Sequence, residues 1–333
     1  MKFTIVIPEL DHPLFLEWCM EGLLKNSVYE HDIIIVYSNP EGAELERREI
    51  SYFKKYGKLP YSINLSDDKI AKEHGVSMNE TELDRYVPST ELYKHSNGYK
   101  NIRELFEGRP DLFKRNNVRL VDVSKEREEL KQKVIVGGNP ENFYHGGIDT
   151  AFKDNMGISL AKTEWVMPNF DDDFYPSPRW DEELIKHIDS NYKCYIPTHI
   201  QPIAFPSPPN WKDKFYDCRE HACARVTIPM TPQYDYIFPE KNFVNFCREI
   251  YHNSCLRENS GARNRLHWVP VLYHRDVLRM VGPKSLCGSG YDLLFDDKMG
   301  QMGIEKVSSR SSFILHKGLV VPDKTIDKSF KYD

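Results

Sequence analysis

Several hallmarks of common protein classes are missing from this chain of 333 residues. No apolar run approaches the roughly 20 residues that a membrane-spanning helix needs, so no membrane span is expected. The opening MKFTIVIPEL lacks the apolar middle and the small-residue cleavage site of a signal peptide, because Pro8, Glu9 and Asp11 interrupt it. Together these absences predict a cytoplasmic protein.

An excess of positive charge is also missing. The chain has 45 Lys and Arg against 50 Asp and Glu, a net charge of −5. An acidic balance gives no general attraction to nucleic acid or anionic membranes, so the composition does not favour a nucleic-acid partner. Cysteine is sparse, with 7 residues, and in a cytoplasmic chain these are expected to be free thiols or metal ligands. There is no internal repeat or low-complexity tract.

The first 40 residues have the pattern of a strand, a helix and a second strand. Residues 3–7 are a continuous apolar run that ends at Pro8, as in a buried parallel strand. Pro13 begins a segment with apolar residues at helical spacing, and residues 33–37 form a second apolar run. This βαβ pattern predicts an α/β fold with a mostly parallel, Rossmann-like central sheet flanked by helices.

The rest of the chain is expected to complete one domain over residues 1–320, followed by a tail over 321–333. Residues 41–117 are polar with nearly balanced charges and predict a helical insertion, which is either a solvated decoration or a lid or acceptor-recognition element. Strand character returns at 118–123 and 134–136, a helix is expected over 146–162, and a strand over 165–167. Residues 197–265 contain an irregular, proline-rich region.

The strongest chemical signal is an acidic turn, Asp171-Asp172-Asp173, directly after the apolar strand 165–167. Ligands of open parallel sheets bind beyond the carboxyl ends of the strands. Three carboxylates there repel one another unless a cation lies among them, and such oxygens suit Mg2+ or Mn2+. The alternative is an acidic loop that caps a helix beginning with Ser177 and Pro178.

The segments around this turn resemble the nucleotide-sugar core of GT-A glycosyltransferases, most closely the large family-2 type. The segment 147–165 resembles the family's helix, small-residue turn and strand that lead to an Asp-x-Asp motif, with matching residues at Lys153, Asn155, Gly157 and Asp171-Asp172-Asp173. Residues 273–297 resemble its acceptor-side segment, in which an acidic pair follows a short aromatic-rich stretch. Residues 314–318 resemble a late strand whose histidine completes the metal site in some relatives.

The resemblance implies a role for each matching residue. Mn2+ or Mg2+ would be bound by Asp173, Asp171 and His316. The nucleotide-sugar donor, UDP- or GDP-linked, would be bound by Pro8, Asn39, Lys153, Asn155, Asp171 and Asp172. Asn39 follows Tyr37 and Ser38 where the family often has a base-reading aspartate. The catalytic base would be Asp297, or its neighbour Asp296.

The implied activity is a metal-dependent, inverting transfer of a sugar from the donor to an acceptor hydroxyl, with a glycan as the expected acceptor. A nucleotidyltransferase is a competing hypothesis, although Pro8-Glu9-Leu10-Asp11 stands where such enzymes carry a glycine-rich phosphate loop. A non-catalytic nucleotide- or sugar-binding protein on the same scaffold is the other. The Cys and His residues between 218 and 255 are either a structural zinc site or ordinary thiols and imidazoles.

Overall fold

The computed structural model describes most of the predicted core. The described residues are 1–10, 12–38, 98–134, 147–175, 178–203, 225–229, 270–286 and 291–316. Asn39, most of the 41–117 region, the Cys and His residues at 218–255 and the 321–333 tail lie outside them. The described end of the 41–117 region contains two helices, α6 (Ile102–Gly108) and α7 (Pro110–Phe113).

The described strands form one nine-stranded sheet in the order β3-β2-β1-β4-β8-β6-β9-β5, with β7 also paired to β6. Five of their eight pairings are parallel. The predicted α/β class with a mostly parallel sheet is therefore confirmed. The strands are β1 (Thr4–Pro8), β2 (Asp32–Tyr37), β3 (Val118–Asp122), β4 (Trp165–Pro168), β5 (Asp173–Phe174), β6 (Lys193–Ile203), β7 (Arg225–Pro229), β8 (Leu272–His274) and β9 (Glu305–His316).

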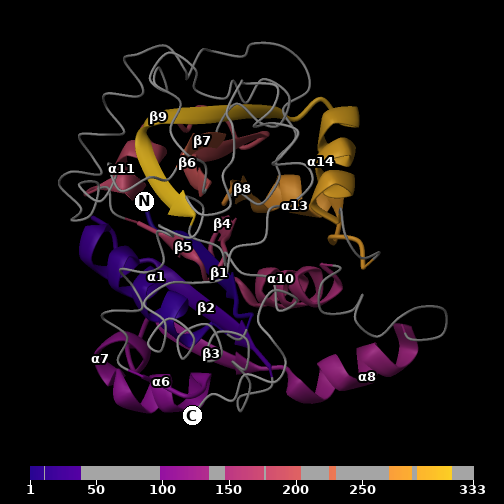
Figure 1. Ribbon diagram of the computed structural model, residues 1–333. Coiled ribbons are helices and arrows are strands. Elements are labelled where there is room, and N and C mark those ends of the chain that lie inside the picture. Colours follow the sequence, from indigo (N-terminus) through magenta and orange to yellow (C-terminus); the bar gives the residue numbers. More distant parts are fainter. Residues whose placement is uncertain are drawn as a thin grey trace, which may run out of the picture.

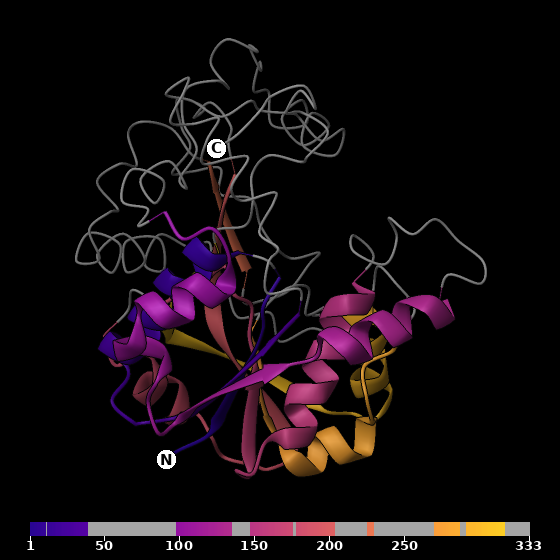
Figure 2. The ribbon, with the colours of Figure 1, turned by 90° about the horizontal axis from the view of Figure 1, so that it is seen from below.

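Helices cover both faces of this sheet (Figures 1 and 2). Because successive side chains of a strand point to opposite faces, β1 contributes to two hydrophobic layers. Ile5 and Ile7 pack on the side of α1 (Pro13–Asn26), α6, α7 and α11 (Trp180–Ile185). Val6 packs on the side of α10 (Ile148–Leu160). The helices α8 (Ser124–Val134), α13 (Arg275–Val281) and α14 (Tyr291–Gln301) lie on the α10 side, as Figure 2 shows.

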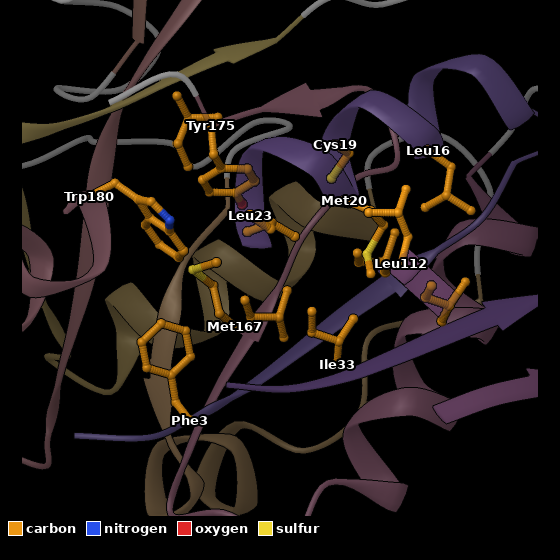
Figure 3. Close-up of a cluster of buried hydrophobic side chains, with 14 of the residues drawn as sticks. Phe3, Leu16, Cys19, Met20, Leu23, Ile33, Leu112, Met167, Tyr175 and Trp180 are labelled. Carbon is orange, nitrogen blue, oxygen red and sulfur yellow. The ribbon is translucent and has the colours of Figure 1, made fainter. Parts of the chain in front are cut away.

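Aliphatic and aromatic side chains together fill the layer between α1 and the sheet (Figure 3). Trp180 and Tyr175 are fully buried, with ring centroids 4.5 Å apart. Phe3, from the start of the chain, meets Trp180 edge-on at 6.1 Å. Because both Tyr175 and Trp180 follow the acidic turn closely, this layer anchors the backbone that leaves the turn.

One glycine determines how closely α10 approaches the sheet. A Cβ atom at Gly157 would lie 2.2 Å from Cγ1 of Val6 and 3.2 Å from Cγ2 of Val36. Contacts between carbon atoms are normally about 3.5–4.0 Å, so only glycine allows this packing distance. The position of α10 matters because its first half carries Lys153, one of the predicted site residues.

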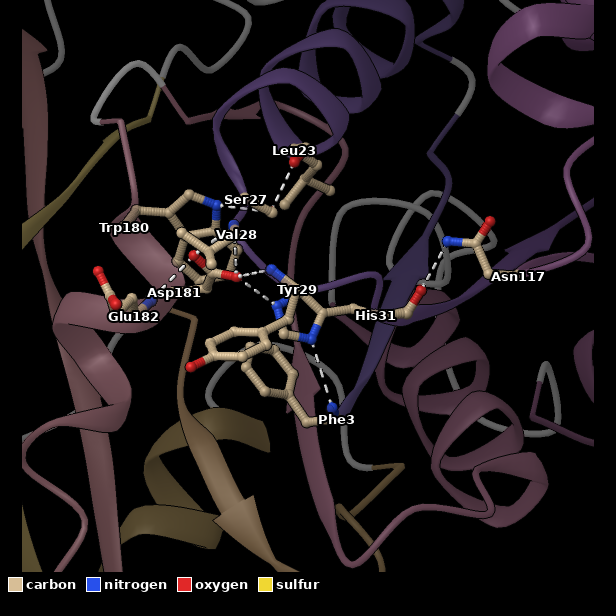
Figure 4. A network of polar contacts seen from close by, with 10 residues as sticks. All are labelled: Phe3, Leu23, Ser27, Val28, Tyr29, His31, Asn117, Trp180, Asp181 and Glu182. Carbon is tan, nitrogen blue, oxygen red and sulfur yellow. Dashed lines mark hydrogen bonds and ion pairs between the residues drawn. The ribbon is translucent and has the colours of Figure 1, made fainter. Parts of the chain in front are cut away.

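A buried polar network links the residues just before β1 and β2 to helix α11 (Figure 4). Nε2 of His31 lies 2.9 Å from Oδ2 of Asp181, which also accepts the amides of Val28 and Tyr29. Nδ1 of His31 accepts the amide of Phe3 at 3.3 Å, so the neutral ring with its proton on Nε2 satisfies both contacts. Burial lowers the pKa of His31, although its contact with Asp181 opposes that shift. The network is structural and lies at the opposite end of β1 from Pro8.

Two local predictions are wrong. Val134 is the last residue of helix α8 rather than the start of a strand, because the preceding Ser-Lys-Glu-Arg-Glu-Glu-Leu segment has helical propensity. Helix α11 begins at Trp180, with Arg179 in a left-handed conformation at its N-cap, so it starts later than a cap at Ser177 would place it. Within the described ranges, no helix is long and apolar enough to cross a membrane.

Candidate active site

The strand order reverses at β1, where the carboxyl ends of β1 and β4 lie side by side. The chain passes from β1 to β2 and β3 on one side and then returns to add β4 on the other side of β1. Such a reversal of strand order is where open α/β sheets bind ligands. Two connections meet at this place: the loop after β1, which contains Glu9, Leu10 and His12, and the acidic turn after β4.

The acidic turn is fixed by its own hydrogen bonds and by β1. The amide of Asn169 donates to the carbonyl of Val6 at 2.8 Å, which continues the β1–β4 pairing. Oδ2 of Asp173 accepts the amide of Phe170 at 3.2 Å, and the Tyr175 hydroxyl donates to Oδ1 of Asn169. The turn is therefore preorganised by groups that come from the strand and from the buried aromatic layer.

Asp171 is a carboxylate of the turn that the loop after β1 holds in place. It is fully buried, and its Oδ2 accepts the amide of Leu10 at 2.7 Å. Nδ1 of His12 lies 3.3 Å from the same oxygen. The other oxygen, Oδ1, is buried without a hydrogen-bond partner. A buried carboxylate oxygen in that state is costly, and a bound cation or a donor group of a ligand would satisfy it.

Asp173 lies beside the last residue of β9. The two-residue strand β5 pairs antiparallel with β9, and Asp173 is directly opposite His316. The register therefore brings together the backbones of two predicted metal ligands that are far apart in the sequence. No group of three His, Cys, Asp or Glu side chains suited to a metal occurs among those that the structure describes, and the His316 side chain is outside that set.

The negative charge of the turn affects two buried neighbours. Burial raises the pKa of the Cys19 thiol well above its ordinary value, and Asp173, Asp171 and Asp172 raise it further. Burial, followed by the charge of Asp173, likewise raises the pKa of the Tyr175 hydroxyl. Both groups therefore stay protonated at neutral pH, and neither adds a negative charge to the turn.

Lys153 and Asn155 come from α10 and are both engaged with protein groups. Nζ of Lys153 donates to the carbonyl of Glu9 at 2.5 Å and lies 3.2 Å from Oδ2 of Asp149, with the residue 1% exposed. The Asn155 amide makes two 2.8 Å hydrogen bonds with the backbone of Lys284. The structure therefore brings Lys153 to the loop after β1, whereas Asn155 joins α10 to the segment after α13.

The predicted base residues lie elsewhere. Asp296 is buried in α14 and forms an ion pair with Lys306 near the start of β9, whereas the acidic turn pairs with the end of β9. Asp297 is exposed, so of the two neighbours it is the one accessible to an acceptor.

Three predicted donor-binding residues remain, namely Pro8, Asp172 and Asn39. Pro8 is the buried last residue of β1 and is paired with Val36, and Asp172 is half-buried in the turn. Asn39 lies outside the described residues. Glu9, Leu10 and His12 were not among the predicted site residues. Their position directly after an apolar strand was a signal for them, but the contacts of Leu10 and His12 with Asp171 depend on a pairing of β1 and β4 across about 160 residues.

Comparisons with known proteins return structural neighbours only. No family model and no curated protein matches the chain. Similar solved structures include the mannosyltransferase PcManGT from Pyrobaculum calidifontis with GDP-Man and Mn2+, at a TM-score of 0.43 and 11% identity. GalNAc-T7 with UDP, GalNAc and Mn2+ matches at 0.42 and 12%. Glucosyl-3-phosphoglycerate synthase from Mycobacterium tuberculosis, with Mn2+ and UDP, matches at 0.36 and 11%.

The alignments cover 97%, 95% and 95% of this chain, respectively. The chain spans 59% of the length of the mannosyltransferase, 43% of GalNAc-T7 and 72% of the synthase. TM-scores below 0.5 do not establish a shared activity. The functional assignment therefore depends on the acidic turn and the residues that surround it.

Proposed function

We propose that this chain is a metal-dependent glycosyltransferase of the GT-A type, which transfers a sugar from a nucleotide-sugar donor to an acceptor hydroxyl. The observation that carries the proposal is the acidic turn itself. It lies at the reversal of strand order, it presents a buried Asp171 oxygen without a partner, and its Asp173 is opposite His316. Oxygen and imidazole groups together suit Mn2+ or Mg2+.

The residues of the turn fit such an ion. Asp171 and Asp173 would hold it, with His316 as a third ligand from β9. A divalent ion bound there neutralises the diphosphate of the donor and makes it a better leaving group. Asp171 is oriented by Leu10 and His12, which leaves one oxygen for the ligand side. The rigid turn thus holds its charge in place before the donor arrives, so little reorganisation is needed during the reaction.

The rest of the mechanism follows from the acceptor. A hydroxyl is a poor nucleophile at neutral pH, so a carboxylate that accepts its proton in the transition state accelerates attack. We assign this role to Asp297, which is exposed, rather than to Asp296, whose carboxylate is bound to Lys306. A base on the face of the sugar opposite the departing diphosphate gives inversion at the anomeric carbon. The donor would be UDP- or GDP-linked, with a glycan as the acceptor.

The donor can be tested before the acceptor is known. UDP- and GDP-sugars are added to the protein with and without Mn2+, and the thermal midpoint is recorded, because a ligand that binds only the folded state raises it. We expect one nucleotide class to stabilise the protein only when Mn2+ is present. Asp173→Ala should abolish that effect, whereas Asp189→Ala, at an exposed carboxylate far from the turn, should keep it. Stabilisation that survives in Asp173→Ala would refute the metal role.

The base can be tested once transfer or donor hydrolysis is measurable. Asp297→Asn should keep donor affinity and lower the rate by orders of magnitude, while Asp296→Asn mainly lowers stability. Asp292, in the first turn of α14, is the comparison carboxylate on the same helix. Normal transfer by Asp297→Asn together with an inactive Asp292→Asn would move the base to Asp292. A product with the donor's anomeric configuration would exclude the inverting mechanism.

A further inference from the structure

We propose that Lys153 is a positioning residue, which fixes the loop after β1 and, through that loop, the orientation of Asp171. This inference rests on the proposed function only in treating Asp171 as a ligand-binding group. The sequence resemblance suggested that Lys153 binds the donor directly. Its contacts point instead to an action through the protein backbone.

Lys153 is the last of three buried, charged side chains that contact one another in a row. Nε of Arg127, from α8, donates to Oδ1 of Asp149 at 2.9 Å, and Oδ2 of Asp149 lies 3.2 Å from Nζ of Lys153. All three residues are at most 5% exposed. The carboxylate of Asp149 therefore holds both cations, and it orients the lysine from one turn earlier on the same helix.

The row ends on the loop after β1. Nζ of Lys153 donates to the carbonyl of Glu9 at 2.5 Å, and the amide of Glu9 donates to the carbonyl of Val36 at 2.9 Å. Oε1 of Glu9 accepts the amide of His12 at 2.9 Å, at the beginning of α1. Both peptide groups that flank Glu9, and the side chain of Glu9, are thus held by hydrogen bonds.

The same loop holds Asp171. The amide of Leu10, directly after Glu9, donates to Oδ2 of Asp171, and the ring of His12 approaches the same oxygen. A change in the direction of the Glu9–Leu10 peptide would turn this amide away from Asp171. Only two hydrogen bonds, with one peptide group between them, separate the Lys153 ammonium from the carboxylate.

Burial energetics favour a positioning role over simple packing. Removing an ammonium group from water is energetically unfavourable, and a hydrophobic side chain would fill the same space without that cost. The ammonium adds a charge-assisted hydrogen bond to one particular carbonyl. A ligand could reach Nζ only by displacing Asp149 or Glu9, since Lys153 is 1% exposed.

Amide hydrogen exchange tests the proposal without any ligand. In Lys153→Met, the amides of Leu10 and His12 should exchange at least about tenfold faster, because Glu9 and the Glu9–Leu10 peptide are no longer held. The matched control is Asp181→Asn, which removes a buried charge at the amino ends of the same strands. It should accelerate the amides of Val28 and Tyr29, which donate to Asp181, and leave those of Leu10 and His12 unchanged. Unchanged exchange at Leu10 and His12 in Lys153→Met would overturn the proposal.

Binding then separates an indirect role from direct contact. The probe is Mn2+ with UDP or GDP, measured by titration calorimetry. Lys153→Met should weaken binding about tenfold, whereas Asp181→Asn should keep it within about twofold at a similar loss of thermal stability. Combined with Asp171→Asn, Lys153→Met should cause no further loss, because its effect passes through that carboxylate. An additive loss would show direct contact with the ligand and overturn the proposal.

Two further outcomes are informative. If Lys153→Met does not fold, Lys153→Gln keeps a donor for the Glu9 carbonyl without the charge, and Asp149→Asn removes the group that orients the lysine. Asp149→Asn should then accelerate exchange at Leu10 and His12 more than Lys153→Gln does, and the reverse order would contradict the proposal. If the wild type binds neither nucleotide with Mn2+, the proposed function fails, while the exchange experiment still decides the role of Lys153.

Discussion

Replacing Gly157 by alanine should destabilise the protein even though alanine is the better helix former. The added Cβ atom would lie 2.2 Å from Cγ1 of Val6, at least 1 Å closer than carbon atoms normally approach. Either Val6 leaves its rotamer in the middle of the sheet or α10 moves outward. Overpacking of this kind lowers the free energy of unfolding by about 3 kcal/mol, the upper end of its usual range. The higher helix propensity of alanine raises the free energy of unfolding by about 1 kcal/mol.

The net loss is therefore about 2 kcal/mol, which lowers the melting temperature of a cooperative chain of this size by about 3 °C. Differential scanning calorimetry of Gly157→Ala measures this shift. Gly300→Ala is the matched control, because its Cβ would have no neighbour within 4 Å, and it should be neutral or slightly stabilising. Val6→Ala combined with Gly157→Ala should lose less stability than the two single losses together, since the clash is removed. A Gly157→Ala protein as stable as the wild type would refute this view of the packing.

Three other predictions concern buried charges and thiols. Stability should fall as the pH drops below about 6.5, because His31 takes up a proton in the unfolded chain, whereas the folded ring, with its lowered pKa, does not. His31→Gln should make stability less dependent on pH, as urea titrations at several pH values would show. Lys284→Met should destabilise by about 3–5 kcal/mol, because Asp154 loses its 2.5 Å partner. Since burial raises the pKa of Asp154, that loss should be smaller at pH 5 than at pH 8, and adding Asp154→Asn should restore part of it. Cys19 should resist iodoacetamide at pH 8 in the folded protein and react in urea, as peptide mass mapping would show; rapid labelling of the folded form would contradict its raised pKa.

The sequence predicted the elements whose signals are local. The apolar runs before Pro8 and Tyr37 and the proline at residue 13 correctly indicated β1, β2 and α1. At the end of α13, Gly282 has a φ of 82°, which explains the preference for glycine there. Val134 was placed in a strand because a short β-branched run carries little information about the charged helix that precedes it.

The candidate site was only partly predictable, for a related reason. Asp171 and Asp173 stand out because three acids follow an apolar strand, a pattern visible within ten residues. The burial of Lys153, by contrast, depends on how closely Gly157 allows α10 to approach β1, and the ion pair of Asp296 depends on the packing of α14 beside the start of β9. The spacing of residues along the sequence does not show which distant segments come into contact. The resemblance therefore implied roles for Lys153 and Asp296 but did not predict the side chains around them.

The pairing of Asp173 with His316 has a consequence for the order in which the molecule is made. These partners are 143 positions apart in the sequence, so at about 5–20 residues per second the acidic turn leaves the ribosome many seconds before its partner strand. During that interval β1 and β4 can already pair, but β5 has no neighbour, because β9 has not been synthesised. The acidic turn therefore gains its pairing with β9 last. A nascent chain does not present the complete candidate site until β9, the final described strand, has joined the sheet.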